Sequence, residues 1–264
     1  MALWKKWILR RCPVFHELTM IPGSNKNGQP EASFPLTMKP GQLYAVVGHT
    51  GSGKSRLIQD LEQLACGDTV TGRHVWINGK LPERQDRFHT SRQLIAHLSQ
   101  NMRFVLDVTV EEFIRMHCTC RQRDWHRVLP EVIDHANTIT PEHLHKENSL
   151  NLLSGGQSRA LMIADVAVLC ESPIVLIDEV ENAGIHKEKA LHLLLKKQKL
   201  VLIATHDPHT ALMSDCRICM KNGGIQSVIQ RNEKEQETWE RLHTYQQYIA
   251  EMQRKMRIGE LCVK

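Results

Sequence analysis

Three short apolar runs stand out in the chain, and each has the length of a buried β-strand. They lie at residues 43–47, 174–177 and 200–204. Near-continuous apolar runs of this kind are typical of parallel strands that helices cover on both faces. Residues 56–64, which follow the first run, have helical periodicity instead. The pattern predicts an α/β fold with a mostly parallel sheet.

Two regions beside these strands have different patterns. Residues 24–28 read SNKNG, and the Asn-Gly pair is a strong signal for a tight hairpin. We therefore expect an antiparallel β subdomain that includes residues 13–38. Residues 103–150 are rich in His, Arg and Glu and have a mostly helical pattern, which predicts a helical subdomain.

The chain from Glu233 onward predicts one long C-terminal helix. Acidic residues crowd its start and basic residues lie near its end, an order that suits the helix dipole. Its apolar positions recur at three- and four-residue spacing. Two interpretations stay open: the helix packs on its own core, or it contacts a partner. The apolar positions are Leu242, Tyr245, Ile249, Met252 and Met256.

The segment GHTGSGKS joins the first predicted strand to its helix and matches the phosphate-binding P-loop pattern. We expect the loop amides and the helix N-terminus to bind phosphate, with Lys54 reaching the β- and γ-phosphates and Ser55 coordinating Mg2+. The predicted fold is therefore a P-loop NTPase core, with ATP and Mg2+ as cofactors. The predicted nucleotide-binding positions are Gly48, His49, Thr50, Gly51, Ser52, Gly53, Lys54, Ser55 and Arg56.

Polar residues follow the other two predicted strands, where ligands bind in open α/β sheets. Asp178 is a candidate Mg2+ ligand, and Glu179 is the candidate general base for the attacking water. His206 is placed to contact the γ-phosphate or to orient that water. The alternatives are a solvent-exposed Asp-Glu pair and a surface histidine, but the combination with the P-loop favours the catalytic roles.

The segment LSGGQ at residues 153–157 resembles the signature of ATP-binding cassette (ABC) ATPases, and the resemblance extends over about residues 31–226. It implies that the signature binds the γ-phosphate of ATP held by another protomer, so that a head-to-tail dimer forms two composite sites. It also implies that Gln100 contacts Mg2+ and links the core to the helical subdomain, and that His206 is the switch histidine. The signature positions are Ser154, Gly155, Gly156 and Gln157.

The sequence departs from this family at two functional positions. The loop after Glu179 has Ile185 where an aspartate is usual, which affects communication across the dimer. No aromatic residue stands at the usual distance before the P-loop to stack on adenine. Phe15 and Phe34 are the nearest candidates, and Phe34 is expected in the core.

The length of 264 residues fits one ATPase domain at residues 1–226, with its helical subdomain at about 103–150, and a C-terminal helical extension at 227–264. The main functional hypothesis is the nucleotide-binding subunit of a membrane transporter, acting with a second ABC protomer and a separate permease chain. The alternative is a soluble ABC-type ATPase that assembles, activates or repairs another macromolecule.

Charge, apolar segments and cysteines indicate which partners the chain binds and in which compartment it acts. The formal net charge is +5, and no stretch has the basic pattern of a nucleic-acid surface. No segment approaches the roughly 20 apolar residues that span a bilayer. Cys216 and Cys219 have metal or redox spacing but no companion pair, so ordinary thiols are the favoured interpretation. Free thiols suggest the cytosol, with the chain peripheral at the inner face of a membrane if it serves a transporter.

Overall fold

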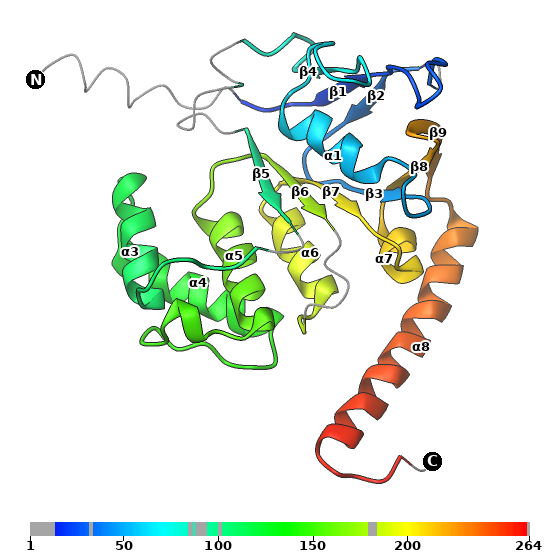
Figure 1. Cartoon of the computed structure of the whole chain (residues 1–264). Helices are drawn as coiled ribbons and strands as arrows, with labels where there is room; N and C mark the ends of the chain where they lie inside the picture. The colour runs from blue at the N-terminus through cyan, green and yellow to red at the C-terminus, as the bar shows by residue number, and fades with distance from the viewer. Residues whose placement is uncertain are drawn as a thin grey trace, which may run out of the picture.

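The strands form two sheets in the computed structural model, which describes residues 14–31, 34–83, 87, 94–99, 102–178 and 184–262 (Figure 1). The smaller sheet is antiparallel, with β1 (Leu18–Ile21) between β2 (Leu36–Met38) and β4 (His74–Ile77). The larger sheet has the order β5-β6-β7-β3-β8-β9 and is parallel except where β9 pairs with β8. Its strands are β3 (Leu43–Val47), β5 (Ile95–Leu98), β6 (Ile174–Asp178), β7 (Leu200–Ala204), β8 (Cys216–Lys221) and β9 (Gly224–Gln230).

Helices cover both faces of the larger sheet (Figure 1). Helix α1 (Lys54–Glu62) lies between the two sheets, and α3 to α6 lie on the opposite side. Helix α8 (Glu233–Arg257) follows the last strand. The other helices of the described ranges are α3 (Val110–Cys120), α4 (Trp125–Ile139), η2 (Leu150–Leu152), α5 (Gly155–Val168), α6 (Lys187–Lys196) and α7 (Pro208–Met213).

Alternate residues of the parallel strands enter two separate hydrophobic cores. On β3, Leu43 and Ala45 join the core formed with α3 to α6, whereas Tyr44 and Val46 join the core formed with α1 and the smaller sheet. All four are buried. Because successive side chains of a strand point to opposite faces, a sheet covered on both faces needs apolar residues at every position. This confirms the α/β fold and the three predicted parallel strands.

The predicted antiparallel element is confirmed, with one strand more than the sequence indicated. Leu18 pairs with Met38 on β2 and with Ile77 on β4, so β4 completes the sheet from beyond the P-loop helix. Gly28 forms the turn with φ of 74°, a conformation that favours glycine. The sequence placed a domain boundary at residue 226, and β9 continues through it to Gln230. The division into domains stays a prediction.

Helix α8 packs on the core at its start and extends away from it afterwards (Figure 1). Trp239 and His243 stack near the ring of His209 on α7, with ring centroids 5.7 and 5.4 Å away. Farther along, Tyr245 is 67% exposed and Met256 is 63% exposed. The core-packing interpretation is therefore confirmed for the first half, while the apolar stripe of the second half faces solvent in the described structure.

Two further features bear on partners and metals. Cys216 is buried and Cys219 is partly exposed on β8, and strand residues three apart face opposite sides, so the two thiols do not converge. Within the described ranges, no three His, Cys, Asp or Glu side chains are arranged to hold a metal ion.

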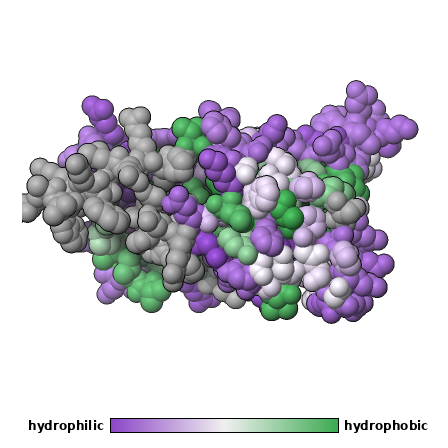
Figure 2. All heavy atoms as spheres, turned by 90° about the horizontal axis from the view of Figure 1, so that it is seen from above, coloured by the Kyte–Doolittle hydropathy of each residue, from purple (hydrophilic) through white to green (hydrophobic). Residues whose placement is uncertain are grey.

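None of the described helices combines the length and apolar character needed to cross a bilayer. Seen from above, the described surface mixes hydrophilic and hydrophobic side chains (Figure 2).

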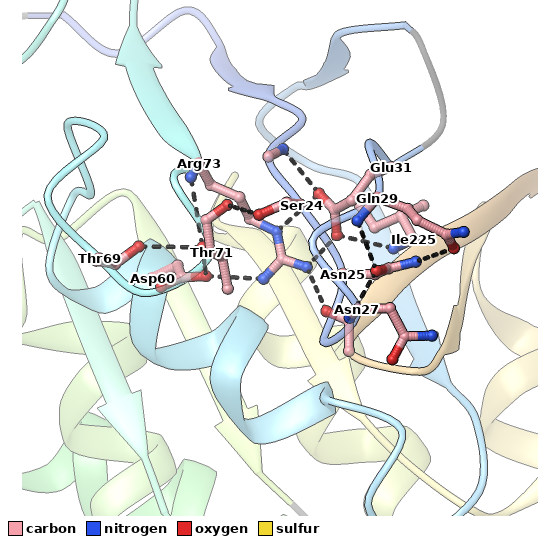
Figure 3. Close-up of polar contacts among 12 residues, drawn as sticks. Ser24, Asn25, Asn27, Gln29, Glu31, Asp60, Thr69, Thr71, Arg73 and Ile225 are labelled. Atoms are coloured by element: carbon pink, nitrogen blue, oxygen red, sulfur yellow. Dashed lines mark hydrogen bonds and ion pairs between the residues drawn. The ribbon is translucent and has the colours of Figure 1, made fainter.

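A buried ionic network joins the smaller sheet to the P-loop helix (Figure 3). Arg73 is fully buried, donates from Nε to Glu31 Oε2 at 3.0 Å and from Nη1 to Asp60 Oδ2 at 2.7 Å, and forms a second bond to Glu31 through Nη2. It also donates to the Gly223 carbonyl at 3.0 Å. Burial opposes the charge on Arg73, but Glu31 and Asp60 keep its pKa above the ordinary value. Four chain segments are therefore fixed to one another by this arginine.

We expect Glu31→Gln to lower the free energy of unfolding by about 3 kcal/mol, because removing one member of a buried ion pair leaves the other charge poorly compensated. The measurement is denaturant unfolding against a matched Glu237→Gln control, whose carboxylate lies exposed on α8. A loss no larger than that of the control would show that the network does not stabilise the fold.

Candidate active site

The carboxyl ends of three parallel strands meet at one edge of the larger sheet. Val46 on β3 lies opposite Ala204 on β7, and Ala204 lies opposite Asp178 on β6. The Thr205 amide donates to the Val46 carbonyl at 3.1 Å, which extends this register beyond the strand. The P-loop, Asp178 and the segment with His206 therefore leave the sheet side by side, where ligands bind in open α/β sheets.

The P-loop packs tightly against the turn between β8 and β9. A Cβ atom at Gly53 would lie 2.7 Å from the Gly223 Cα, and one at Gly48 would lie 2.6 Å from the Met220 carbonyl oxygen. Gly53 also has φ of 106°, which a side chain would make strained. The Gly223 amide donates to the Ser52 carbonyl at 2.8 Å and fixes the loop there. Glycine at these two positions is thus a packing requirement.

The N-terminus of α1 has the features of an anion site. No side chain caps this helix, whereas α3 is capped by Thr109 and α5 by Ser154. The free amides and the helix dipole favour an anion at this end. The Ser52 hydroxyl is buried and has no hydrogen-bond partner among the described residues. These donors fit a phosphate chain, and the exposed Ser55 beside them supplies a hydroxyl suited to Mg2+.

Lys54 lies beside His206 inside this edge. Its side chain is buried, and Nζ donates to the carbonyls of Gly48 at 3.1 Å and His49 at 3.4 Å. Nζ also lies 2.9 Å from His206 Nε2. Because an ammonium only donates, Nε2 accepts and the histidine carries its ring proton on Nδ1. The ammonium of Lys54 thus bridges two carbonyls of the P-loop, and phosphate oxygens can replace these carbonyls as its acceptors.

The remaining predicted site residues near this edge are distributed as follows. Asp178 ends β6 next to β7. Thr50 and Arg56 are exposed at the mouth of the P-loop and on the first turn of α1. Gln100 and Glu179 lie outside the described residues. Asp207, after the predicted histidine, caps α7.

The signature segment forms a separate cluster at the start of α5. Ser154 is the N-cap: its hydroxyl accepts from the Gln157 amide at 3.2 Å and donates to Glu142 Oε2 at 2.6 Å. Gln157 accepts from the Ser154 amide and donates to the His143 carbonyl. A Cβ atom at Gly155 would meet nothing within 4 Å, so the helix start is open. In the described structure, no hydrogen bond of these side chains reaches the P-loop of the same chain.

Sequence reasoning missed two side chains at these sites. Lys26 donates from Nζ to the Gly51 carbonyl at 2.8 Å, across the mouth of the P-loop. Glu142 binds the signature serine. Lys26 lies in the hairpin that the Asn-Gly pair predicts, but that pattern does not indicate a contact with the P-loop. Glu142 lies in an irregular segment 12 residues before the signature serine, and no motif marks it. Only the folded chain brings them to these positions.

The structure also places the residues at which the sequence departs from the expected pattern. Ile185 packs against the main core, as an apolar residue at that position should. Phe15 packs against the second core, and Phe34 is 47% exposed, so the expectation that Phe34 is a core residue is wrong. Phe34 lies just before β2, and the described residues leave its ring partly uncovered.

Comparison with known proteins gives one consistent result. A family model described as ABC transporter matches residues 32–182. An uncharacterized ABC transporter ATP-binding protein of Methanocaldococcus jannaschii is 50% identical over 244 residues, which cover 92% of this chain and 94% of the relative. The LolD ATP-binding protein of the lipoprotein-releasing system of Psychrobacter arcticus is 28% identical over 71% of this chain and 85% of its own length.

Solved structures share the fold. The cbiO1 protein of Clostridium perfringens, part of the ABC transporter complex cbiONQ, superposes with a TM-score of 0.65 at 18% identity, over 94% of this chain and all of its own. A dimeric ATP-binding cassette in a post-hydrolysis state, bound to ADP and Pi, superposes with a TM-score of 0.62 at 22% identity. The match covers 81% of this chain and 99% of that structure's chain.

We expect Lys54→Met to weaken ATP binding at least tenfold, because it removes a charge-assisted contact worth roughly 1.5–3 kcal/mol. Methionine keeps most of the side-chain volume, so the fold should stay intact. Fluorescence titration with a labelled ATP analogue measures the affinity, and Lys80→Met, at an exposed site, is the matched control. Equal affinity of the two variants would refute the assignment of the phosphate site.

Proposed function

The chain belongs to the ABC transporter family, and from that premise we propose that it is the ATP-hydrolysing subunit of a membrane transporter. The observation that carries the proposal is the convergence of the P-loop, Asp178 and His206 at one sheet edge, with the signature segment exposed elsewhere on the chain. This arrangement supplies one complete phosphate-binding half and one complementary half per protomer. Two copies in head-to-tail order then give two ATP sites.

Each P-loop residue has a definite task in this proposal. The amides at the start of α1 and the Ser52 hydroxyl bind the phosphate chain. The Lys54 ammonium exchanges the carbonyls of Gly48 and His49 for the β- and γ-phosphates as hydrogen-bond partners. Ser55, Gln100 and Asp178 hold Mg2+, which neutralises charge on the phosphates when bound.

The catalytic step is assigned to two residues at the strand ends. Glu179 accepts a proton from the attacking water as general base. When Lys54 turns to the phosphates, His206 exchanges the lysine for the γ-phosphate, and Nε2 must then carry a ring proton because phosphate oxygens only accept. This exchange of Lys54 for the γ-phosphate couples nucleotide binding to the position of His206.

The second half of each site comes from the partner protomer. Ser154, Gly155, Gly156 and Gln157 present the start of α5 to the γ-phosphate bound by the other copy. The Ser154 hydroxyl must first leave Glu142, because the carboxylate and the phosphate would repel each other. Closure of the dimer therefore includes a change of hydrogen-bond partner at the signature.

The membrane part of the transporter is assigned to a separate permease chain. Relatives of this chain are named as ATP-binding proteins of a lipoprotein-releasing system and of energy-coupling factor transporters. We assign the contact with the permease to the helical subdomain at about residues 103–150, linked to the ATP site through Gln100. We further propose that the chain lies at the cytoplasmic face of the membrane and that residues 227–264 extend the ATPase domain.

We expect Glu179→Gln to bind ATP normally but to hydrolyse it about 10²–10⁴ times more slowly, because the amide keeps the shape and loses the base. Trapped ATP should then hold two copies together, and light scattering should report a dimer only with Mg-ATP. Glu181→Gln is the matched control in the same loop and should turn over normally. A Glu179→Gln protein that stays at 30.3 kDa with saturating ATP would contradict the composite-site dimer.

A further inference from the structure

The hairpin at residues 24–30 lies directly against the P-loop. Lys26 donates from Nζ to the Gly51 carbonyl at 2.8 Å, and its own amide donates to the Asn222 carbonyl at 2.9 Å. Next to it, the Gly223 amide donates to the Ser52 carbonyl. The hairpin, the β8–β9 turn and the P-loop are therefore each hydrogen-bonded to the other two. The Lys26 side chain makes the contact across the mouth of the P-loop.

Side chains of the hairpin itself and the buried network around Arg73 fix the position of this hairpin (Figure 3). The Asn25 side chain accepts from the amides of Asn27 and Gln29 at 2.9 and 3.1 Å, so the turn is held by its own residues. Glu31, at the hairpin's end, accepts from the Gly23 amide and binds Arg73 in the buried network. Lys26 thus projects from a rigid support, which lowers the entropy cost of directing it at a ligand.

The charge on Lys26 has no carboxylate partner in the described part of the chain. Among the described residues, its ammonium donates to the neutral Gly51 carbonyl alone, and the side chain is exposed. Lys54 approaches the same loop from the inside. The two ammonium groups lie on either side of a loop whose amides already favour an anion, so this arrangement favours a ligand with several negative charges.

We propose that Lys26 is a second nucleotide-binding lysine, whose ammonium leaves the Gly51 carbonyl and pairs with the phosphate chain of ATP. The inference rests on the proposed ATPase function and adds a residue that the P-loop pattern does not contain. Residues 24–30 read SNKNGQP and include no aromatic ring, so this hairpin supplies charge and not stacking.

The test compares Lys26→Met with Lys80→Met, since both remove an exposed lysine from the antiparallel layer. The expected result is about a tenfold weaker affinity for Mg-ATP in Lys26→Met alone, the usual size of one charge-assisted contact. Lys26→Arg should recover most of that affinity because it restores the charge. Thermal unfolding of the same proteins shows whether the fold is unchanged.

Wild-type affinity for Mg-ATP in Lys26→Met would overturn the inference, and a lowered unfolding temperature with unchanged affinity would reduce Lys26 to a structural clamp. A wild-type protein that binds no ATP would instead overturn the proposed function itself.

Discussion

The parallel pairing of β3, β7 and β6 is the constraint on which the rest of the structure depends. It aligns the ends of three strands that are far apart in the sequence, so that Lys54 and His206, 152 residues apart, meet at 2.9 Å. Parallel strands bury both faces, and this requires the continuous apolar runs and the helices on either side. One edge of the sheet is left for polar chemistry, and all the strand-end groups gather there.

A second constraint is the way in which the smaller sheet is fixed to this core. Arg73 binds Glu31 from the hairpin, Asp60 from the P-loop helix and the Gly223 carbonyl from the turn before β9. A buried ionic group of this kind adds little net stability over an apolar one but is sensitive to loss of any partner. Its value here is positional: it sets where the hairpin and the turn meet the P-loop.

Much of this could be predicted from the sequence because the signals are local. The apolar runs marked β3, β6 and β7, and GHTGSGKS marked the loop between a strand and a helix. The start of α5 was also locally encoded, since Ser154 and Gln157 form a capping box. By contrast, the pairing of β4 with β1 and the contacts of Lys26 and Glu142 depend on tertiary packing, which no motif records. The C-terminal pattern likewise predicted a helix but not which half of it meets the core.

The central claim is that each ATP site is shared between two copies, and mixing two inactive variants tests it most directly. Lys54→Met has a defective P-loop and an intact signature, whereas Ser154→Arg has an intact P-loop and a defective signature. Hybrid dimers contain one site built from the two intact halves, so the account predicts ATP hydrolysis well above the sum of the separate variants. Activity in the mixture that equals that sum, under conditions where the wild type is dimeric, would contradict the account.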